Sequence, residues 1–146
     1  MSMPSDYLKA LEIERERVME SILNPRGLKQ RHVLIVGGAG YVGSVLSDHF
    51  LKKGYRVRCF DNLLYNHGLT VVPFLNNPNY QFIHGDLASE ENFTSALGGI
   101  SDVILLAGLV GDPVTKKYPE QAARVNDEGH DQMVRLLNGK GINKVV

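Results

Sequence analysis

The sequence predicts an α/β fold, a doubly wound parallel sheet preceded by an N-terminal helical extension. After residue 31, short apolar runs rich in β-branched residues alternate with amphipathic stretches. This alternation is typical of a parallel sheet covered by helices on both faces. A glycine-rich turn, IVGGAGYVGS at positions 35–44, joins the first run to the first amphipathic stretch. With right-handed crossovers, the ligand crevice lies where strand order reverses between the first and fourth strands.

Residues 1–30 are expected to form the helical extension. A helix is predicted over 5–23, and four apolar residues roughly follow one of its faces: Leu8, Leu11, Val18 and Ile22. The other face is charged. We expect this helix to pack on the domain or on a partner subunit. An amphipathic membrane anchor is the alternative, which the mixed charges of the polar face disfavour.

Residues 31–146 are predicted to form the sheet and its covering helices. The predicted strands are 32–36, 55–60, 80–84, 102–107 and 142–146, with a short apolar piece at 71–75. The predicted helices are 40–53, which Gly54 closes, 89–97, which Ser89 is placed to cap, and 119–137. The first helix is expected to pack through Val42, Val45, Leu46, His49 and Phe50. The third is expected to pack through Ala122, Val125, Gly129, Met133, Leu136 and Leu137.

The composition argues against several classes of function. Lys and Arg number 16, as do Asp and Glu, so bulk charge does not favour nucleic acid or an anionic membrane as partner. No stretch is long and apolar enough to span a membrane. The single cysteine, Cys59, forms no internal disulfide, which fits a reducing, cytoplasmic compartment. The five histidines show no ligand-like spacing, so no metal site is expected.

Three glycines at intervals of three, Gly37, Gly40 and Gly43, predict a dinucleotide site. The helix beginning near Gly40 presents unpaired N–H groups and a positive dipole end, which suit a pyrophosphate. We expect Gly37 to permit the tight turn, Gly40 to let the phosphate approach the backbone, and Gly43 to let the helix pack against the strand. The alternative is a glycine turn that only packs.

Polar and small residues follow the next three predicted strands. Asp61 can accept hydrogen bonds from both hydroxyls of the adenosine ribose and would repel a 2′-phosphate, which favours NAD over NADP; alternatively it makes a turn with Asn62. Asp86, in HGDL, is placed to bind the adenine amino group or to cap the next helix. At the end of the fourth strand, three residues would let the cofactor lie close: Leu106, Ala107 and Gly108. The loop 109–118 would overhang the nicotinamide and substrate, with Asp112, Thr115, Lys116 and Lys117 as candidate contacts.

Five stretches resemble the N-terminal half of the extended short-chain dehydrogenases/reductases, specifically the NAD-dependent epimerase/dehydratase group that acts on nucleotide sugars. They are VLIVGGAGYVGSVL, CFDNLLYN, HGDL, VILLAGLVGDP and YPEQAARVNDEG. The resemblance implies a Rossmann-type NAD-binding domain and a homodimer. It also implies that Tyr41 and Val42 offer backbone N–H groups to the phosphates. In the same way Asn62 joins Asp61 at the ribose, Leu87 joins Asp86 at the adenine, and Asn126 shapes the site from its helix.

Two departures from the family pattern limit the assignment. Sugar 4-epimerases of the galactose type have a lysine where this chain has Val110. The family's catalytic Tyr-x-x-x-Lys pair is absent, because none of the six tyrosines is followed by lysine four residues later. We therefore expect no catalytic residue in this sequence, and we interpret it as part of a longer or split polypeptide.

The leading hypothesis is the NAD-binding half of an enzyme that oxidises a nucleotide-sugar hydroxyl, leading to epimerisation, dehydration or reduction. One alternative is a non-catalytic NAD-binding sensor or scaffold, because the fold alone does not decide function. Another is a reductase of a small non-sugar carbonyl.

Overall fold

The computed structural model describes Arg15 and residues 31–109, 116–117 and 119–146. The chain divides into two units, Met1–Gln30 and Arg31–Val146. The predicted helix over 5–23 lies outside the described residues except for Arg15, which is helical. Of the second unit, the structure describes the sheet and the helices that cover it.

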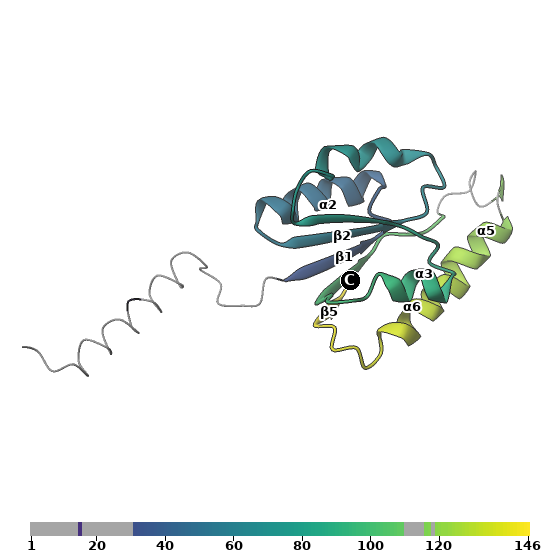
Figure 1. Cartoon of the computed structure of the whole chain (residues 1–146). Helices are drawn as coiled ribbons and strands as arrows, with labels where there is room; N and C mark the ends of the chain where they lie inside the picture. Colours follow the sequence, from purple (N-terminus) through teal and green to yellow (C-terminus); the bar gives the residue numbers. More distant parts are fainter. Residues whose placement is uncertain (1–14, 16–30, 110–115, 118) are drawn as a thin grey trace, which may run out of the picture. The chain divides into compact units, whose positions relative to one another are not determined.

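Five parallel strands form one sheet in the order β3-β2-β1-β4-β5 (Figure 1). Their bounds are β1 His32–Val36, β2 Arg56–Asp61, β3 Tyr80–His84, β4 Asp102–Leu105 and β5 Lys144–Val145. The order reverses between β1 and β4, as the predicted Rossmann-type sheet requires. The carboxyl ends of β2, β1 and β4 therefore meet at one edge of the sheet.

Three strands differ in their bounds from the prediction: β2 is shifted by one residue, and β4 and β5 are shorter than expected. Asp61 is the last residue of β2 rather than the residue after it. The fourth strand ends at Leu105, not at Ala107, because β1 turns away after Val36. The last hydrogen bond between the two strands is the one that the Leu106 N–H donates to the Val36 carbonyl at 2.8 Å. Leu106, Ala107 and Gly108 therefore form an exit loop.

Helices cover both faces of the sheet (Figure 1). On one face lie α2 (Tyr41–Lys52) and the 3-10 helices η1 (His67–Thr70) and η2 (Val72–Phe74). The predicted apolar piece at 71–75 contains η2. On the other lie α3 (Glu90–Ser95), α5 (Pro119–Ala123) and α6 (His130–Leu137). The expected cap holds, since Ser89 Oγ accepts from the Asn92 N–H at 3.4 Å. The predicted helix 119–137 is interrupted by a π-helix, η3 (Arg124–Gly129).

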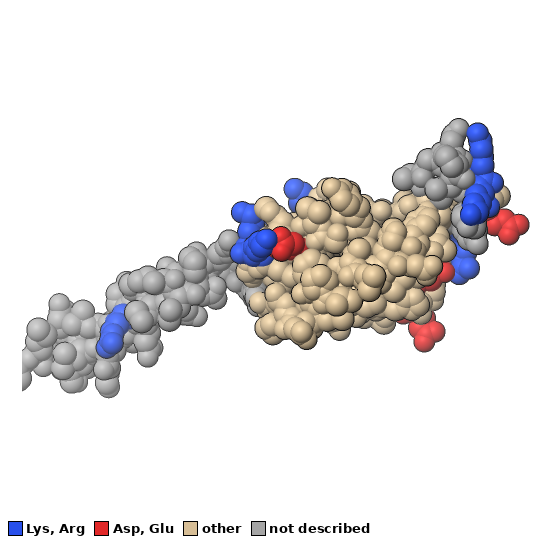
Figure 2. Space-filling view, turned by 90° about the horizontal axis from the view of Figure 1, so that it is seen from above, with Lys and Arg blue, Asp and Glu red and all other residues tan. Residues whose placement is uncertain are grey.

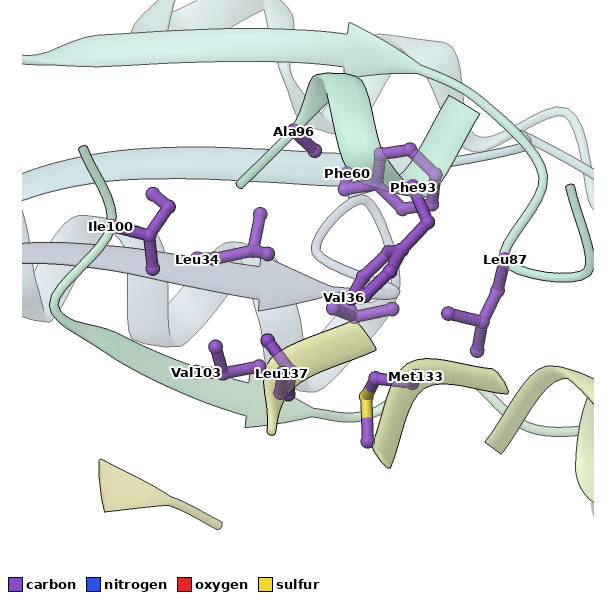
Figure 3. Packing of buried hydrophobic residues seen from close by; sticks show 10 residues of the cluster. All are labelled: Leu34, Val36, Phe60, Leu87, Phe93, Ala96, Ile100, Val103, Met133 and Leu137. Carbon is purple, nitrogen blue, oxygen red and sulfur yellow. The ribbon is translucent and has the colours of Figure 1, made fainter. Parts of the chain in front are cut away.

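The core consists of two apolar clusters, one on each face of the sheet. Every residue of β1 is buried, as in a strand covered on both sides. Its even-numbered residues Leu34 and Val36 face α3 and α6, where they pack with Phe60, Phe93 and Met133 (Figure 3). Its odd-numbered apolar residues, Val33 and Ile35, belong to the cluster on the α2 face.

The inner face of α2 agrees with the prediction only in part. Leu46 and Phe50 pack against the core as expected. The buried residues of the helix are Gly43 and Ser47, whereas Val42 and Val45 are 53% and 56% exposed. The face over α2 and the 3-10 helices consists mostly of uncharged residues, with Lys and Arg side chains toward its margins (Figure 2). No helix in the part of the chain that the structure describes is long and apolar enough to cross a membrane.

Small residues bring α2 against the glycine turn and the turn against β2. A Cβ atom at Gly43 would lie 2.5 Å from the Cα of Gly38, and one at Gly38 would lie 2.6 Å from the Sγ of Cys59. The start of α2 therefore packs directly on the glycine turn, and the turn packs on β2 through the Cys59 side chain. Gly43 thus packs against the turn, not against the strand as expected.

We predict that Gly43→Ala lowers the free energy of unfolding by about 1–3 kcal/mol, because the added methyl overlaps backbone that cannot move aside. Gly98→Ala is the matched control, since a Cβ there meets nothing within 4 Å, and it should change stability by less than about 1 kcal/mol. Urea unfolding of the three chains measures this. Equal stabilities of the two variants would contradict the packing described.

Candidate functional site

A cavity of about 220 Å³ lies at the carboxyl ends of the strands. The ends of β1 and β2 and the exit loops after β3 and β4 contribute to its walls. Most of the predicted cofactor residues line it: Gly37, Gly40, Asp61, Asn62, Asp86, Leu87, Leu106, Ala107 and Gly108. Its position is the crevice expected at the reversal of strand order.

The glycine turn forms the floor of this cavity. Gly37 has φ +80°, and its N–H donates to the Phe60 carbonyl at 2.8 Å. A Cβ there would lie 2.6 Å from the Ala107 nitrogen, so the β4 exit loop packs directly on the turn. Gly40 is the extended N-cap residue of α2, with no side chain accepting from the first turn. This arrangement fits an anionic group such as a pyrophosphate, because backbone N–H groups and the helix dipole face the cavity without intervening side chains.

Asp61 ties the glycine turn to the loop after β2. Its Oδ2 accepts from the Ala39 N–H at 3.0 Å, and its Oδ1 accepts from the Leu63 N–H at 2.8 Å. The local turn is thus made with Leu63, while Asn62 Oδ1 accepts from the Leu64 N–H at 3.0 Å. Each carboxylate oxygen has a further lone pair, so Asp61 can still accept bonds from a ligand in the cavity.

Asp86 is held by two groups at the end of β3. Its Oδ1 accepts from the Ala88 N–H at 2.9 Å, and its Oδ2 lies 3.0 Å from Arg124 Nη2. Ser89 provides the cap of α3, so the expected alternative, Asp86 as the helix cap, is wrong.

The helical segment α5–η3–α6 holds both exit loops from one side. Asn126 Oδ1 accepts from the Leu109 N–H and Asn126 Nδ2 donates to the Leu109 carbonyl, both at 2.9 Å. His130 Nε2 lies 2.9 Å from the Ala107 carbonyl. Gln132 Nε2 donates to the Leu87 carbonyl at 2.9 Å. The backbone of each exit loop is therefore fixed by side chains of this segment.

Four predicted residues do not line the cavity. The side chains of Tyr41 and Val42 are exposed, at 85% and 53%, so their predicted part rests on backbone N–H groups. Gly43 packs on the turn, and Asn126 acts on the cavity through Leu109.

A group of lining residues from the loop after β2 and the start of η1 was not predicted from the sequence. Leu63, Leu64, Tyr65 and His67 all line the cavity, and the rings of Tyr65 and His67 lie 5.6 Å apart. Leu63 and Asn66 have positive φ values, 54° and 56°. The missed signal was the spacing of Tyr65 and His67, four and six residues after Asp61. Gly85 and Val125 were missed as well.

The loop expected over the nicotinamide is only partly described. Val110, Asp112 and Thr115 lie outside the described residues, and the exposed Lys116 and Lys117 do not line the cavity. Within the described ranges, no group of three or more His, Cys, Asp and Glu residues could hold a metal ion.

Comparison with known proteins identifies similar chains. The sequence model of the NAD dependent epimerase/dehydratase family matches residues 33–146. The UDP-glucose 4-epimerase of Klebsiella pneumoniae is 32% identical over 120 residues, which are 78% of this chain and 85% of that protein. The 3-beta-hydroxysteroid dehydrogenase of Mycolicibacterium neoaurum is 29% identical over 118 residues, 78% of this chain but 30% of that protein.

Solved structures match the same region. An epimerase from Methanothermobacter thermautotrophicus superposes with a TM-score of 0.74 at 26% identity, covering 82% of this chain and 35% of that one. The UDP-glucose 4-epimerase of Thermus thermophilus, in complex with NAD, gives a TM-score of 0.68 at 25% identity, covering 78% and 36%. This chain thus spans about a third of the length of these structures and of the steroid dehydrogenase.

We predict that Asn126→Ala speeds hydrogen exchange of the Leu109 amide by about tenfold or more, because the amide loses Asn126 Oδ1 as its hydrogen-bond acceptor. Asp127→Ala, at the neighbouring exposed position, is the control and should leave this exchange unchanged. Hydrogen exchange of the Leu109 amide, measured by NMR in the native chain and both variants, tests this prediction. Unaltered Leu109 protection in Asn126→Ala would show that the side chain does not hold the exit loop.

Proposed function

The chain belongs to the NAD dependent epimerase/dehydratase family, and from this premise we propose that residues 31–146 are the NAD-binding part of an oxidoreductase or isomerase acting on a nucleotide sugar. The observation that carries the proposal is the cavity above the uncapped start of α2, flanked by carboxylates after β2 and β3. Sequence relatives and structural neighbours that are UDP-glucose 4-epimerases support this substrate class.

The proposed binding mode assigns one part of the cofactor to each wall. The backbone N–H groups of Tyr41 and Val42 receive the pyrophosphate at the start of α2, and Gly40 lets the phosphate approach the backbone. Asp61 and Asn62 accept from the adenosine ribose, and Asp86 and Leu87 receive the adenine. The exit loop Leu106–Gly108, held by His130 at Ala107, lies along the cofactor toward the nicotinamide.

The chemistry supplied by bound NAD is acceptance of a hydride from the substrate carbon that carries the hydroxyl. The chain's own residues orient the dinucleotide and shield one side of it. No Tyr-x-x-x-Lys pair occurs in the 146 residues, so they provide no family-type base for the hydroxyl proton. We therefore propose that the chain alone binds NAD and turns over no nucleotide sugar. We also propose a cytoplasmic homodimer for the protein to which it belongs.

A second candidate substrate is a sterol or steroid hydroxyl. The 3-beta-hydroxysteroid dehydrogenase and sterol-4-alpha-carboxylate 3-dehydrogenase relatives support it, at 27–29% identity. Both candidates use the same cofactor half, so the substrate is decided by assaying the protein that contains this chain with UDP-sugars and 3-hydroxysteroids, following NADH formation.

We predict that the native chain prefers NAD to NADP, and that Asp61→Ala narrows this preference by about 1–3 kcal/mol, the scale of a charged hydrogen bond. The carboxylate gains hydroxyl bonds with NAD and repels the 2′-phosphate of NADP. The ratio of affinities from calorimetry is the readout, because it cancels any loss from the broken Ala39 and Leu63 contacts.

Asp48→Ala is the charge-matched control, since Asp48 is an α2 residue outside the cavity, paired with Lys52. It should leave the preference unchanged. Equal binding of NAD and NADP by the native chain would refute the assignment of Asp61.

We further predict that deleting residues 1–28 leaves NAD affinity within about threefold, less than 1 kcal/mol. No cavity residue of the described chain precedes Val36. Calorimetry of the shortened and complete chains checks this, and a loss of about tenfold would place part of the cofactor site in the extension.

A further inference from the structure

Arg124 occupies a position at the cofactor cavity that the proposed binding mode does not use. It is the first residue of the π-helix η3, and its Nη2 lies 3.0 Å from Asp86 Oδ2. The Asp86 side chain is 32% exposed and that of Arg124 56%. The guanidinium thus reaches from the helical segment to the carboxylate at the wall of the cavity, while much of it remains in solvent.

The two oxygens of Asp86 have different environments. Oδ1 accepts from the Ala88 N–H, within its own loop. The Asp86 N–H donates to Asn92 Oδ1 at 3.1 Å, which fixes the backbone on the other side. Only Oδ2 is oriented by a residue from a different element, Arg124. Removal of the guanidinium would leave the Ala88 N–H as the remaining contact of the carboxylate, so Oδ2 would no longer be held in one direction.

Further contacts from η3 and α6 hold the loop that carries Asp86. Gln132, in α6, donates to the carbonyl of Leu87, the residue after Asp86. A Cβ at Gly129, the last residue of η3, would lie 3.2 Å from Leu87 Cγ. The loop after β3 therefore contacts both ends of η3, at Arg124 and at Gly129, and Arg124 supplies the charged contact. π-Helices are frequent at functional sites.

We propose that Arg124 is a positioning residue that sets the purine specificity of the cavity; this rests on the proposed NAD-binding function. The guanidinium pairs with the Asp86 carboxylate and fixes Oδ2 as an acceptor facing the base. An acceptor in that position pairs with the exocyclic amine of adenine. It repels the carbonyl oxygen that a 6-oxopurine carries at the same place, so the dinucleotide of adenine is selected.

The test compares NAD with nicotinamide hypoxanthine dinucleotide, in which a carbonyl replaces the exocyclic amine of the purine and the neighbouring N1 carries a hydrogen. The complete chain is titrated with each by 1H–15N NMR, which also reports whether each variant is folded. The native chain should prefer NAD by about fivefold or more, a difference typical of a mispaired polar group. Arg124→Gln should reduce the preference to below about twofold, and Arg124→Lys should retain part of it.

Arg135→Gln is the matched control, because Arg135 is an exposed arginine of α6 outside the cavity lining. It should keep the native purine preference, and Arg124→Gln should keep the native ratio of NAD to NADP affinity, since the ribose end is held by Asp61. An Arg124→Gln chain that binds NAD with the native purine preference would overturn this inference alone. A native chain that binds neither dinucleotide would overturn the proposed function and the inference with it.

Discussion

Close backbone packing around the glycine turn is the constraint on which the rest of the site depends. Gly37 lies against the nitrogen of Ala107, Gly38 against Cys59, and Gly43 against Gly38, with no space for a Cβ at any of the three. The turn is therefore fixed between β2, α2 and the exit loop of β4. This fixes the start of α2 above the end of β1, and the cavity forms where the two neighbouring strands diverge. A side chain in this turn would move the helix away and fill the approach to its N–H groups.

The segment α5–η3–α6 provides the second constraint, because it connects two loops that the sheet leaves separate. Asn126 and His130 hold the loop after β4 through Leu109 and Ala107. Gln132 and Arg124 hold the loop after β3 through Leu87 and Asp86. An α-helix has 3.6 residues per turn and hydrogen bonds between residues four apart. The π-helical bonds of η3 join residues five apart, so each turn holds an extra residue and the side chains that follow are rotated around the axis. The two walls of the cavity are consequently linked by one rigid element.

Sequence patterns predicted the parts of this structure that local chemistry determines. The apolar strand 32–36, the Ser89 cap and the position of Gly37 in a tight turn follow from residue types alone. For the inner face of α2, the prediction was right for Leu46 and Phe50. It was wrong for Val42 and Val45, because close approach to the turn requires the small residues Gly43 and Ser47 at the contact. The π-helix and the links from Asn126 and His130 depend on tertiary contacts between distant segments, and no periodicity encodes those. The same is true of the hydrogen bond that the Ala39 N–H donates to Asp61, since the two residues are 22 positions apart in the sequence.

We propose that a dinucleotide binds over the start of α2, with its adenosine half between the carboxylates after β2 and β3. Backbone amide shifts recorded while the 15N-labelled chain is titrated with NAD map the residues that bind it. We expect the largest shifts on residues 37–43, on Asp61 and Leu63, and on Asp86 and Leu87, and no change in the amides of β5. Shifts confined to another surface, or none at millimolar NAD, would contradict it.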